Sequence, residues 1–293
     1  MLVTLNEVLR DAKKNKYAVG LFNTVNLEMA MGVLAAAEEL RSPVIIGSAE
    51  CLLCYSGLDD LANMLLPMAK RASVPVVLHF DHGLKLDMVK KAIQLGFTSV
   101  MYDCSTDDYY SNMGRVRCLT QYAHERGVTV EAELGHGGAN DGSAENHGPG
   151  DHSIYTDPAQ AKEYAEATGV DALAVAIGTA HGAYKSKPKL DFERLETIAS
   201  MVKCPLVLHG GSGLSDDDFK QSVAKGISKV NIFTDINAAF AKTAAAMYKP
   251  GMGQTDLMPA VKQLSKRQPW RRSSCSVLPA DIDWKNTKKF SVR

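Results

Sequence analysis

The chain has 293 residues, of which 45% are hydrophobic and 23% charged, a composition typical of a soluble globular protein that can bury a core. Its 33 Lys and Arg residues balance 33 Asp and Glu residues, so the net charge favours neither a nucleic-acid partner nor an acidic membrane surface. No apolar stretch reaches the roughly 18 residues of a membrane helix, and residues 1–20 carry Asp and Lys where a signal peptide needs an apolar run. We therefore expect a cytoplasmic protein.

The six cysteines form no dense framework, which indicates reduced thiols rather than disulfides. Cys51 and Cys54 make one CxxC motif. Without a second pair, the motif is a weak signal for zinc or redox chemistry, and we interpret the two cysteines as buried or incidental.

Short apolar runs alternate with longer amphipathic stretches along most of the chain. This alternation is typical of repeated strand–helix units, and runs rich in Val, Ile and Leu are expected of parallel strands covered on both faces. We predict strands at residues 17–23, 43–48, 75–82, 99–103, 128–135, 172–178, 205–211 and 229–235. We predict helices at residues 27–40, 57–72, 85–95, 107–126, 158–168, 191–202 and 215–226.

Residue types that begin and end helices support these positions. Asp157, Asp191 and Ser215 stand where N-caps are expected, because their side chains accept hydrogen bonds from the first free N–H groups. Glycines stand where helices should stop. These are Gly96, Gly127, Gly169 and Gly226.

Eight strands with intervening helices and no domain-sized gap predict one α/β domain, a closed (β/α)8 TIM barrel over residues 1–250. An open doubly wound sheet is the alternative, and it is disfavoured because the phosphate-type glycines come late in the chain. Two segments interrupt the alternation. Residues 135–156 are long, polar and Gly-rich, as active-site lids are, and residues 251–293 form a basic, aperiodic tail.

Three histidines fall at the ends of three different predicted strands: His82, His181 and His209. The carboxyl ends of barrel strands meet at one rim, where the reactive groups of such barrels lie. Three imidazoles that leave one coordination position open are a catalytic zinc arrangement. A single histidine would more often be a hydrogen-bonded rim residue, but three at strand ends predict a metal site.

Two carboxylates lie at the same rim. Asp103 and Glu133 are predicted either to orient the histidines or to offer a second metal position, and the alternative is that they pair with Lys or Arg. The GGSG segment after His209 predicts a phosphate site, because glycines let the backbone approach an anion closely. Asn231 and Thr234 would complete that pocket.

The motifs YAVGLFN, PVVLHFDHG, VEAELG, AVAIGTAHG, LVLHGGSG and KVNIFTD occur in this order between residue 17 and residue 235. In sequence and order they resemble the class II ketose-bisphosphate aldolase family. The resemblance covers residues 1 to about 240 and is specific. It implies a zinc-dependent aldolase that acts on a small-molecule sugar phosphate and is a homodimer or homotetramer, while the balanced charge predicts no nucleic-acid or membrane partner.

The resemblance also implies roles for particular residues. Asp81, from the DH pair, would be the catalytic acid/base that takes the C4 hydroxyl proton. His82, His181 and His209 would bind one catalytic Zn2+, with Asp103 and Glu133 at a possible second metal position. A sugar phosphate, cleaved to dihydroxyacetone phosphate and an aldehyde, would contact Asn23, Gly182, Gly210, Gly211, Ser212, Asn231, Ile232, Phe233 and Thr234. The family's phosphate site usually involves a monovalent cation, for which the sequence offers no position.

The chain departs from the family in the long loop. The family's loop continues from GG to a pair containing glutamate, which shuttles a proton of the enediolate. Here Asn140 stands at that place, and an amide cannot act as a carboxylate base. Asp141, Glu145, His147 and His152 are the candidates to replace the glutamate. The particular ketose phosphate therefore stays open.

Two other functions remain as alternatives. A zinc hydrolase on the same barrel would use the metal to make hydroxide and would not need the GGSG phosphate site. A non-catalytic sugar-phosphate-binding barrel would account for Asn140 and for the tail. The DH pair and the other two histidines favour the aldolase over both.

The tail generates a prediction about the gene. The family's chains usually end near MEKIRLFGSAGK, whereas residues 265–280 read SKRQPWRRSSCSVLPA. The codons possible for these residues, read from the third base of each codon, allow ATTMEKIKLFGSAG. We therefore hypothesise a coding frameshift before residue 265. Resequencing of the locus should reveal this second reading frame, and its absence there would contradict the hypothesis.

Overall fold

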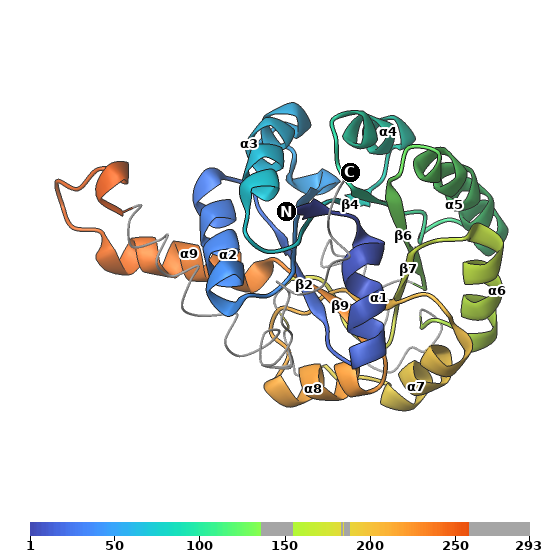
Figure 1. Ribbon diagram of the computed structural model, residues 1–293. Coiled ribbons are helices and arrows are strands. Elements are labelled where there is room, and N and C mark those ends of the chain that lie inside the picture. The colour runs from blue at the N-terminus through green and yellow to red at the C-terminus, as the bar shows by residue number, and fades with distance from the viewer. Residues whose placement is uncertain (136–154, 183, 185–187, 258–293) are drawn as a thin grey trace.

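The structure, a computed structural model, describes residues 1–135, 155–182, 184 and 188–257. Its centre is a closed ring of eight parallel strands, closed by the pairing of β4 with β5 (Figure 1). The strands are β2 (Val19–Asn23), β3 (Val44–Ala49), β4 (Val76–Gly83), β5 (Ser99–Tyr102), β6 (Thr129–Leu134), β7 (Ala172–Val175), β8 (Leu206–Leu208) and β9 (Ile227–Ile232). The (β/α)8 TIM barrel of the α/β class, predicted from the alternation, is thereby confirmed.

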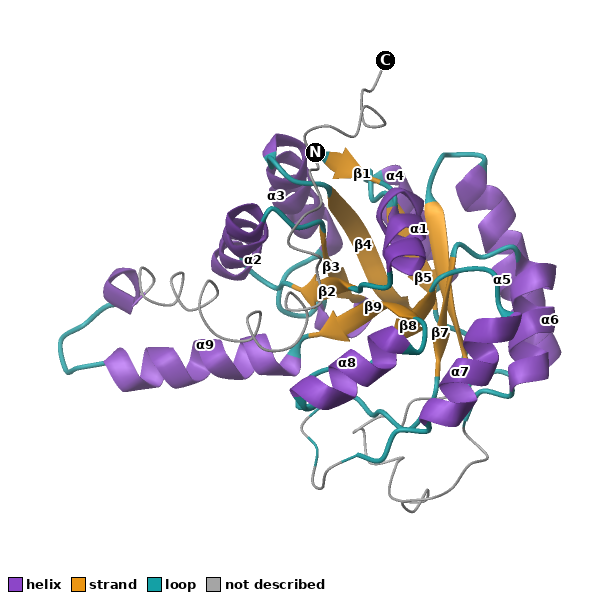
Figure 2. Cartoon of the chain, turned by 60° about the horizontal axis from the view of Figure 1, so that its bottom comes forward, coloured by secondary structure: helices purple, strands orange, loops and turns teal. Residues whose placement is uncertain are grey.

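Helices follow the strands and cover the outside of the ring (Figure 2). They are α2 (Leu27–Leu40), α3 (Leu58–Arg71), α4 (Leu86–Gln94), α5 (Tyr109–His124), α6 (Pro158–Thr168), α7 (Phe192–Met201) and α8 (Asp216–Ala224). The predicted bounds differ from these by at most two residues. The side chains of Asp157, Asp191 and Ser215 cap their helices as predicted, and the four helix-ending glycines all have positive φ.

Four elements were not predicted: β1 (Leu2–Val3), α1 (Leu5–Asn15), the short 3-10 helix η1 (Glu50–Leu52) and α9 (Thr234–Met247). The strand predicted at 229–235 ends at Ile232, because Phe233 leaves the extended conformation and α9 begins at Thr234. Helix α9 extends away from the barrel in both views (Figures 1 and 2).

Helix α1 closes the amino-terminal end of the barrel interior. Its residues Leu5, Val8 and Leu9 are fully buried and join an apolar cluster with inward-facing strand residues such as Val77 and Val207. A larger apolar cluster fills the layer between the strands and the surrounding helices. The interior is therefore sealed at one end, and the carboxyl ends of the strands form the other.

The predicted boundary at residue 250 stays a prediction, because residues 258–293 lie outside the described part of the chain. Within the described residues, no helix combines the length and hydrophobicity needed to cross a bilayer.

Gly47 and Gly114 give a matched test of the packing. A Cβ on Gly47 in β3 would lie 1.8 Å from the carbonyl oxygen of His79 in β4, so Gly47→Ala must separate two paired strands. We expect it to lower the free energy of unfolding by about 1–3 kcal/mol or more.

A Cβ on Gly114, exposed in α5, meets nothing within 4 Å. Gly114→Ala should raise the same quantity by about 0.5–1 kcal/mol, because alanine is the better helix former. Urea denaturation of both variants measures the two effects, and equal effects would contradict this account of Gly47.

Candidate metal and substrate site

The three predicted histidines converge at the carboxyl rim of the barrel. His82 lies at the end of β4, His209 directly follows β8, and His181 lies in the segment after β7. The ring centroid of His82 lies 4.9 Å from that of His181 and 4.5 Å from that of His209. The centroids of His181 and His209 lie 5.7 Å apart. The three residues form one group whose potential ligand atoms all lie within 4.8 Å of one another. The tertiary structure thus brings together side chains that are up to 127 positions apart in sequence.

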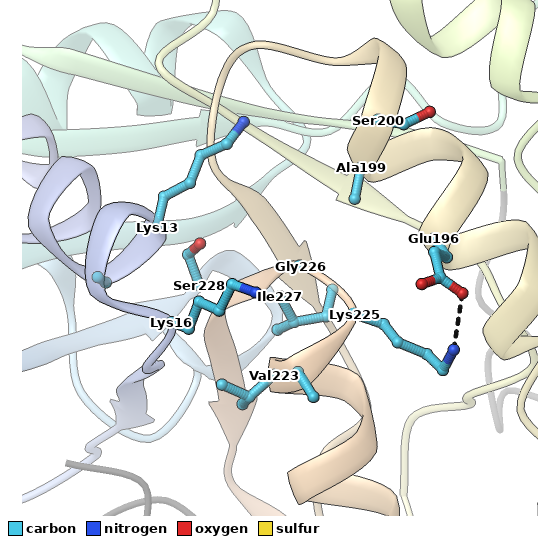
Figure 3. Close-up of a pocket in the computed structure, with 12 residues that line it drawn as sticks. Lys13, Lys16, Glu196, Ala199, Ser200, Val223, Lys225, Gly226, Ile227 and Ser228 are labelled. Atoms are coloured by element: carbon cyan, nitrogen blue, oxygen red, sulfur yellow. Dashed lines mark hydrogen bonds and ion pairs between the residues drawn. The ribbon is translucent and has the colours of Figure 1, made fainter. Parts of the chain in front are cut away.

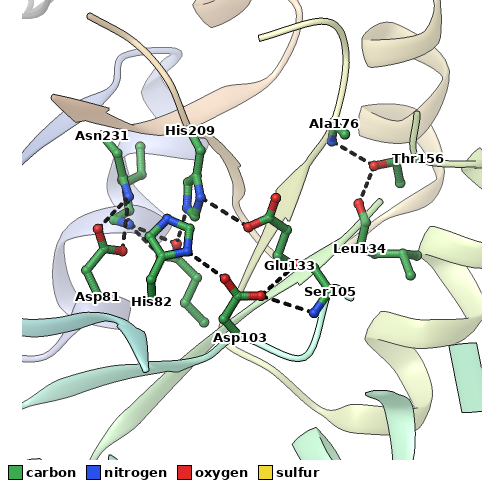
Figure 4. A network of polar contacts seen from close by, with 12 residues as sticks. Asp81, His82, Asp103, Ser105, Glu133, Leu134, Thr156, Ala176, His209 and Asn231 are labelled. Carbon is green, nitrogen blue, oxygen red and sulfur yellow. Dashed lines mark hydrogen bonds and ion pairs between the residues drawn. The ribbon is translucent and has the colours of Figure 1, made fainter. Parts of the chain in front are cut away.

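A bulge in β4 lets two consecutive residues serve the same site. Between Phe80 and Gly83, β4 advances three residues while β5 advances two, and His82 has a φ of 42°. Neighbouring side chains of a regular strand point to opposite faces, but a bulge re-aims a side chain. Asp81 and His82 therefore both face the interior, where Figure 4 shows them beside Asn231 and His209.

Each of the three histidines has one buried nitrogen without a hydrogen-bond partner: Nε2 of His82, Nε2 of His181 and Nδ1 of His209. For His82 and His209, the other ring nitrogen contacts a carboxylate oxygen, Oδ2 of Asp103 at 2.7 Å and Oε1 of Glu131 at 3.0 Å. A carboxylate behind a ligating imidazole fixes the tautomer and ring orientation of the ligand. The residues present fit a divalent metal ion, which would bind these three nitrogens.

Electrostatics at the site also suit a cation. Burial, together with positive charge on His82 and His209, lowers the pKa of His181 to about 4, so this imidazole is neutral. Burial would lower the pKa of His209 too, but Glu133 and Glu131 raise it to about 10. The pKa of His82 is likewise raised, because Asp81 and Asp103 outweigh its burial. The carboxylates therefore stabilise positive charge here, which a metal ion would supply in place of the protons.

Asp103 and Glu133 lie where the sequence places them, beside the histidines. Asp103 accepts hydrogen bonds from the backbone N–H and hydroxyl of Ser105 and contacts His82 (Figure 4). Glu133 Oε2 lies 3.3 Å from Nδ1 of His209. The two carboxylates and His82 form a second group that could hold a metal ion. In this geometry both predicted roles, orienting the histidines and ligating a second metal, remain predictions.

Asp81 is almost fully buried, at 1% exposure, and its carboxylate accepts hydrogen bonds from two amides. Nδ2 of Asn23 lies 2.7 Å from Oδ2, and Nδ2 of Asn231 lies 3.1 Å and 3.3 Å from the two oxygens. Burial alone would raise the pKa of Asp81, but the positive charges of His82 and Lys229 hold it well below its usual value. Asp81 is therefore an ionised carboxylate held in one orientation.

Two segments that carry predicted substrate-binding residues lie side by side at the rim. Gly210 approaches the backbone of Ala180 so closely that a Cβ would lie 2.4 Å from its carbonyl oxygen. The hydroxyl of Tyr184 bridges the same two segments, accepting from Ala180 N–H and donating to the Gly210 carbonyl. The segments that carry His181 and GGSG are therefore held together. Gly182, with a φ of 93°, lies in the first of them.

Helix α9 begins against the GGSG segment. The N–H of Gly211 donates to the Asn231 carbonyl, and the N–H of Gly213 donates to the Asp235 carboxylate. Ser212 Oγ accepts from the N–H of Asp235 in the first turn of α9. Two N–H groups of the loop are thus engaged within the protein. An anion here would rely on other donors and on the positive end of the 14-residue helix α9, which starts at Thr234 after Ile232 and Phe233.

Four polar residues beneath the rim were not singled out as functional from the sequence: Ser48, His79, Glu131 and Lys229. All four are fully buried, and the Ser48 hydroxyl has no hydrogen-bond partner. The sequence does carry a signal for three of them. His79 stands two residues before Asp81, Glu131 two before Glu133, and Lys229 two before Asn231. The period of two in a strand places such residues on the same inward face.

A concavity lies at the opposite, amino-terminal end of the barrel (Figure 3). Its volume is about 260 Å³, and helices α1, α7 and α8 contribute to its lining. The Lys13 ammonium donates to three backbone carbonyls, and Lys225 pairs with Glu196. No histidine or cysteine lines it, whereas the candidate metal-binding groups of the described residues all include histidines of the barrel interior and rim.

The candidates to replace the loop glutamate fall outside the described residues. They are Asp141, Glu145, His147 and His152, and Asn140, which stands in the glutamate's place, lies outside the described residues as well. Thr156 anchors the returning chain, where its hydroxyl donates to the Leu134 carbonyl and accepts from Ala176 N–H (Figure 4).

Fold and site together define a class of protein: a TIM-barrel enzyme with a histidine metal-type site beside a buried carboxylate. Comparison with known families is more specific. Residues 3–272 match the family described as class II fructose-bisphosphate aldolase. The chain belongs to this family, which confirms the resemblance drawn from the motifs.

Solved structures of aldolases resemble the whole barrel. The YdjI aldolase from Escherichia coli K12 is 37% identical, with 91% of this chain and 94% of that chain covered and a TM-score of 0.81. A putative fructose-1,6-bisphosphate aldolase from Coccidioides immitis is 29% identical, with 89% and 92% covered and a TM-score of 0.81. Fructose-bisphosphate aldolase from Campylobacter jejuni is 25% identical, with 90% and 92% covered and a TM-score of 0.76. Family and neighbours support an aldolase, a carbon–carbon lyase.

The geometry predicts metal binding that depends on His181. The wild-type protein should bind one divalent ion tightly, and His181→Ala should weaken binding by at least about 100-fold, since even residues behind the ligands contribute 10–100-fold. Affinity should fall as the pH falls, because the imidazoles must release protons to bind metal. Competition with a chromophoric chelator measures both effects. His124→Ala, at a half-exposed histidine paired with Asp171, is the control, and equal losses in the two variants would contradict the site.

Proposed function

We propose that the protein is a metal-dependent class II aldolase that reversibly cleaves a ketose phosphate into dihydroxyacetone phosphate and an aldehyde. The observation that carries the proposal is the convergence of three buried imidazole nitrogens that make no hydrogen bond beside the buried carboxylate of Asp81. Membership of the aldolase family supports it.

Zinc is the metal that three imidazoles with an open position suit best. Bound by His82, His181 and His209, it would act as a Lewis acid on the substrate carbonyl and on the negative charge that cleavage leaves. Asp103 orients His82 through the 2.7 Å contact with its Nδ1.

Asp81 is the proposed base for the C4 hydroxyl proton. Its pKa lies below the usual value, so at neutral pH the carboxylate carries no proton, as a base requires. The amides of Asn23 and Asn231 hold its two oxygens in place. In the synthesis direction the same carboxyl group returns the proton to the new alkoxide.

The substrate's phosphate group is proposed to bind the GGSG segment at the start of α9, with Gly182, Gly210, Ser212 and Thr234 nearest the anion. A monovalent cation at the phosphate stays a prediction. The residue that shuttles the enediolate proton belongs to the loop of residues 136–154, outside the described part of the chain. The bridge made by Tyr184 places the proposed phosphate segment beside the segment of His181.

Asp81→Asn tests the proposal. The amide has nearly the same shape but cannot accept the hydroxyl proton, so kcat should fall by about 100-fold to 10,000-fold with little change in KM. The measurement is dihydroxyacetone phosphate release, coupled to a dehydrogenase, over a panel of ketose mono- and bisphosphates. Chelation should abolish release, and added zinc should restore it.

The matched control is Asp59→Asn, which removes an exposed carboxylate paired with Lys91 and should leave kcat unchanged. Circular dichroism of each variant checks folding. If folded, zinc-loaded wild type releases no dihydroxyacetone phosphate from any member of the panel, the proposal fails for these substrates. Release that survives chelation would overturn the role of the metal.

A further inference from the structure

Lys229 is a lysine with no solvent exposure inside the barrel. It lies in the middle of β9, two residues before Asn231, and is among the largest fully buried side chains of the described structure. Lysine is almost never fully buried unless it is paired, and a buried ammonium is costly unless charge and hydrogen bonds offset the loss of water. The partners of the Lys229 ammonium therefore indicate its role.

The ammonium contacts two side chains. It donates to Oε1 of Glu131 at 2.9 Å and lies 2.7 Å from Oε2, and it donates to Oδ1 of Asn231 at 2.8 Å. Glu131 is also without solvent exposure. Each partner contacts a different part of the site. Two series of contacts, or arms, therefore start at Lys229, one through Glu131 and one through Asn231.

The first arm leads to His209 of the candidate metal site. Oε1 of Glu131, which accepts from Lys229, lies 3.0 Å from Nε2 of His209. When that nitrogen carries the hydrogen, the lone pair of the ring is on Nδ1, the atom without a hydrogen-bond partner. Lys229 thus fixes the carboxylate that selects the tautomer of a proposed ligand.

The second arm leads to Asp81. The side-chain amide of Asn231 can be placed in two ways, with its oxygen and nitrogen exchanged. Because an ammonium is only a donor, it must face the oxygen, and the NH2 group then faces Asp81 at 3.1 Å and 3.3 Å. Lys229 thus fixes which end of this amide meets the proposed base.

Other roles for Lys229 fit the geometry less well. A nucleophilic lysine must be neutral and within reach of substrate, whereas this ammonium is paired with a carboxylate beneath the rim. His79, Asp81 and Glu131 could form a further metal group, but the ammonium already supplies the positive charge that Glu131 requires.

We propose that Lys229 is a positioning residue, whose single ammonium group orients His209 through Glu131 and Asp81 through Asn231. The proposal rests on the proposed aldolase function for its Asp81 arm. Its His209 arm concerns metal binding alone.

Lys229→Met, which keeps the length of the side chain without the charge, tests both arms. We expect zinc affinity, measured by chelator competition without substrate, to fall by about 10–100-fold, as for other residues behind a ligand. At saturating zinc, kcat should fall by about 100-fold, within the range for impaired acid–base catalysis, with KM changed little. A crystal structure of the variant should show the Asn231 amide no longer held toward Asp81.

The double variant Lys229→Met/Glu131→Gln separates positioning from neutralisation of a buried charge. Removing both charges should restore much of the melting temperature lost in Lys229→Met, yet leave kcat low. Lys225→Met, at a partly exposed lysine paired with Glu196 at the other end of the barrel, is the control and should match wild type in zinc affinity and kcat.

Wild-type zinc affinity and kcat in folded Lys229→Met would overturn the proposal. Recovery of both in the double variant would also overturn it, because Lys229 would then only neutralise Glu131. If wild type itself releases no dihydroxyacetone phosphate, the proposed function fails, and zinc affinity and the Asn231 amide in the variant's crystal structure still decide the role of Lys229.

Discussion

The ion pair between Lys229 and Glu131 lies at the centre of the barrel, and the site above depends on it. Both side chains are without solvent exposure, so each charge must be balanced by the other and by hydrogen bonds, because desolvating an ion costs several kcal/mol. Below the pair, α1 seals the interior with apolar side chains. Exclusion of water lowers the local dielectric and strengthens the pair and the hydrogen bonds that continue from it.

The bulge in β4 is the second constraint on the site. A regular strand would direct Asp81 and His82 to opposite faces of the barrel wall. The extra residue and the positive φ of His82 bring both inward. A positive φ in a residue other than glycine is unfavourable, and the contact with Asp103 helps to hold it. Backbone strain of this kind persists where the surrounding structure enforces it, commonly at functional sites.

The rim above these residues is held by tertiary contacts as well. Tyr184 ties the His181 segment to GGSG, and Asp235 ties GGSG to the first turn of α9. Some backbone N–H groups of GGSG, which the glycine-rich sequence suggests as hydrogen-bond donors to an anion, donate instead to groups of the protein. These contacts hold the segments that would position a phosphate next to the candidate metal site.

Local sequence determined much of the fold and the outer layer of the site. Apolar runs, capping residues and glycines marked strands and helices because these signals act within one turn or one strand. Once eight parallel strands were inferred, Asp81 and the three histidines at strand ends had to share a rim, since parallel strands end at the same side. The motifs then identified the family, and the match over residues 3–272 agrees with them.

Tertiary structure alone decided the inner layer. The period of two relates Lys229 and Glu131 to Asn231 and Glu133, but barrel strands are buried on both faces and read as continuous apolar runs, so the sequence did not show that these two side chains pair inside the barrel. Helix α1 was not predicted, because its apolar face finds a packing partner only when the strands close into a barrel and leave one end of the interior open. The bulge that turns His82 inward arises from pairing between β4 and β5, and contacts between segments distant in sequence leave no local pattern in either of them.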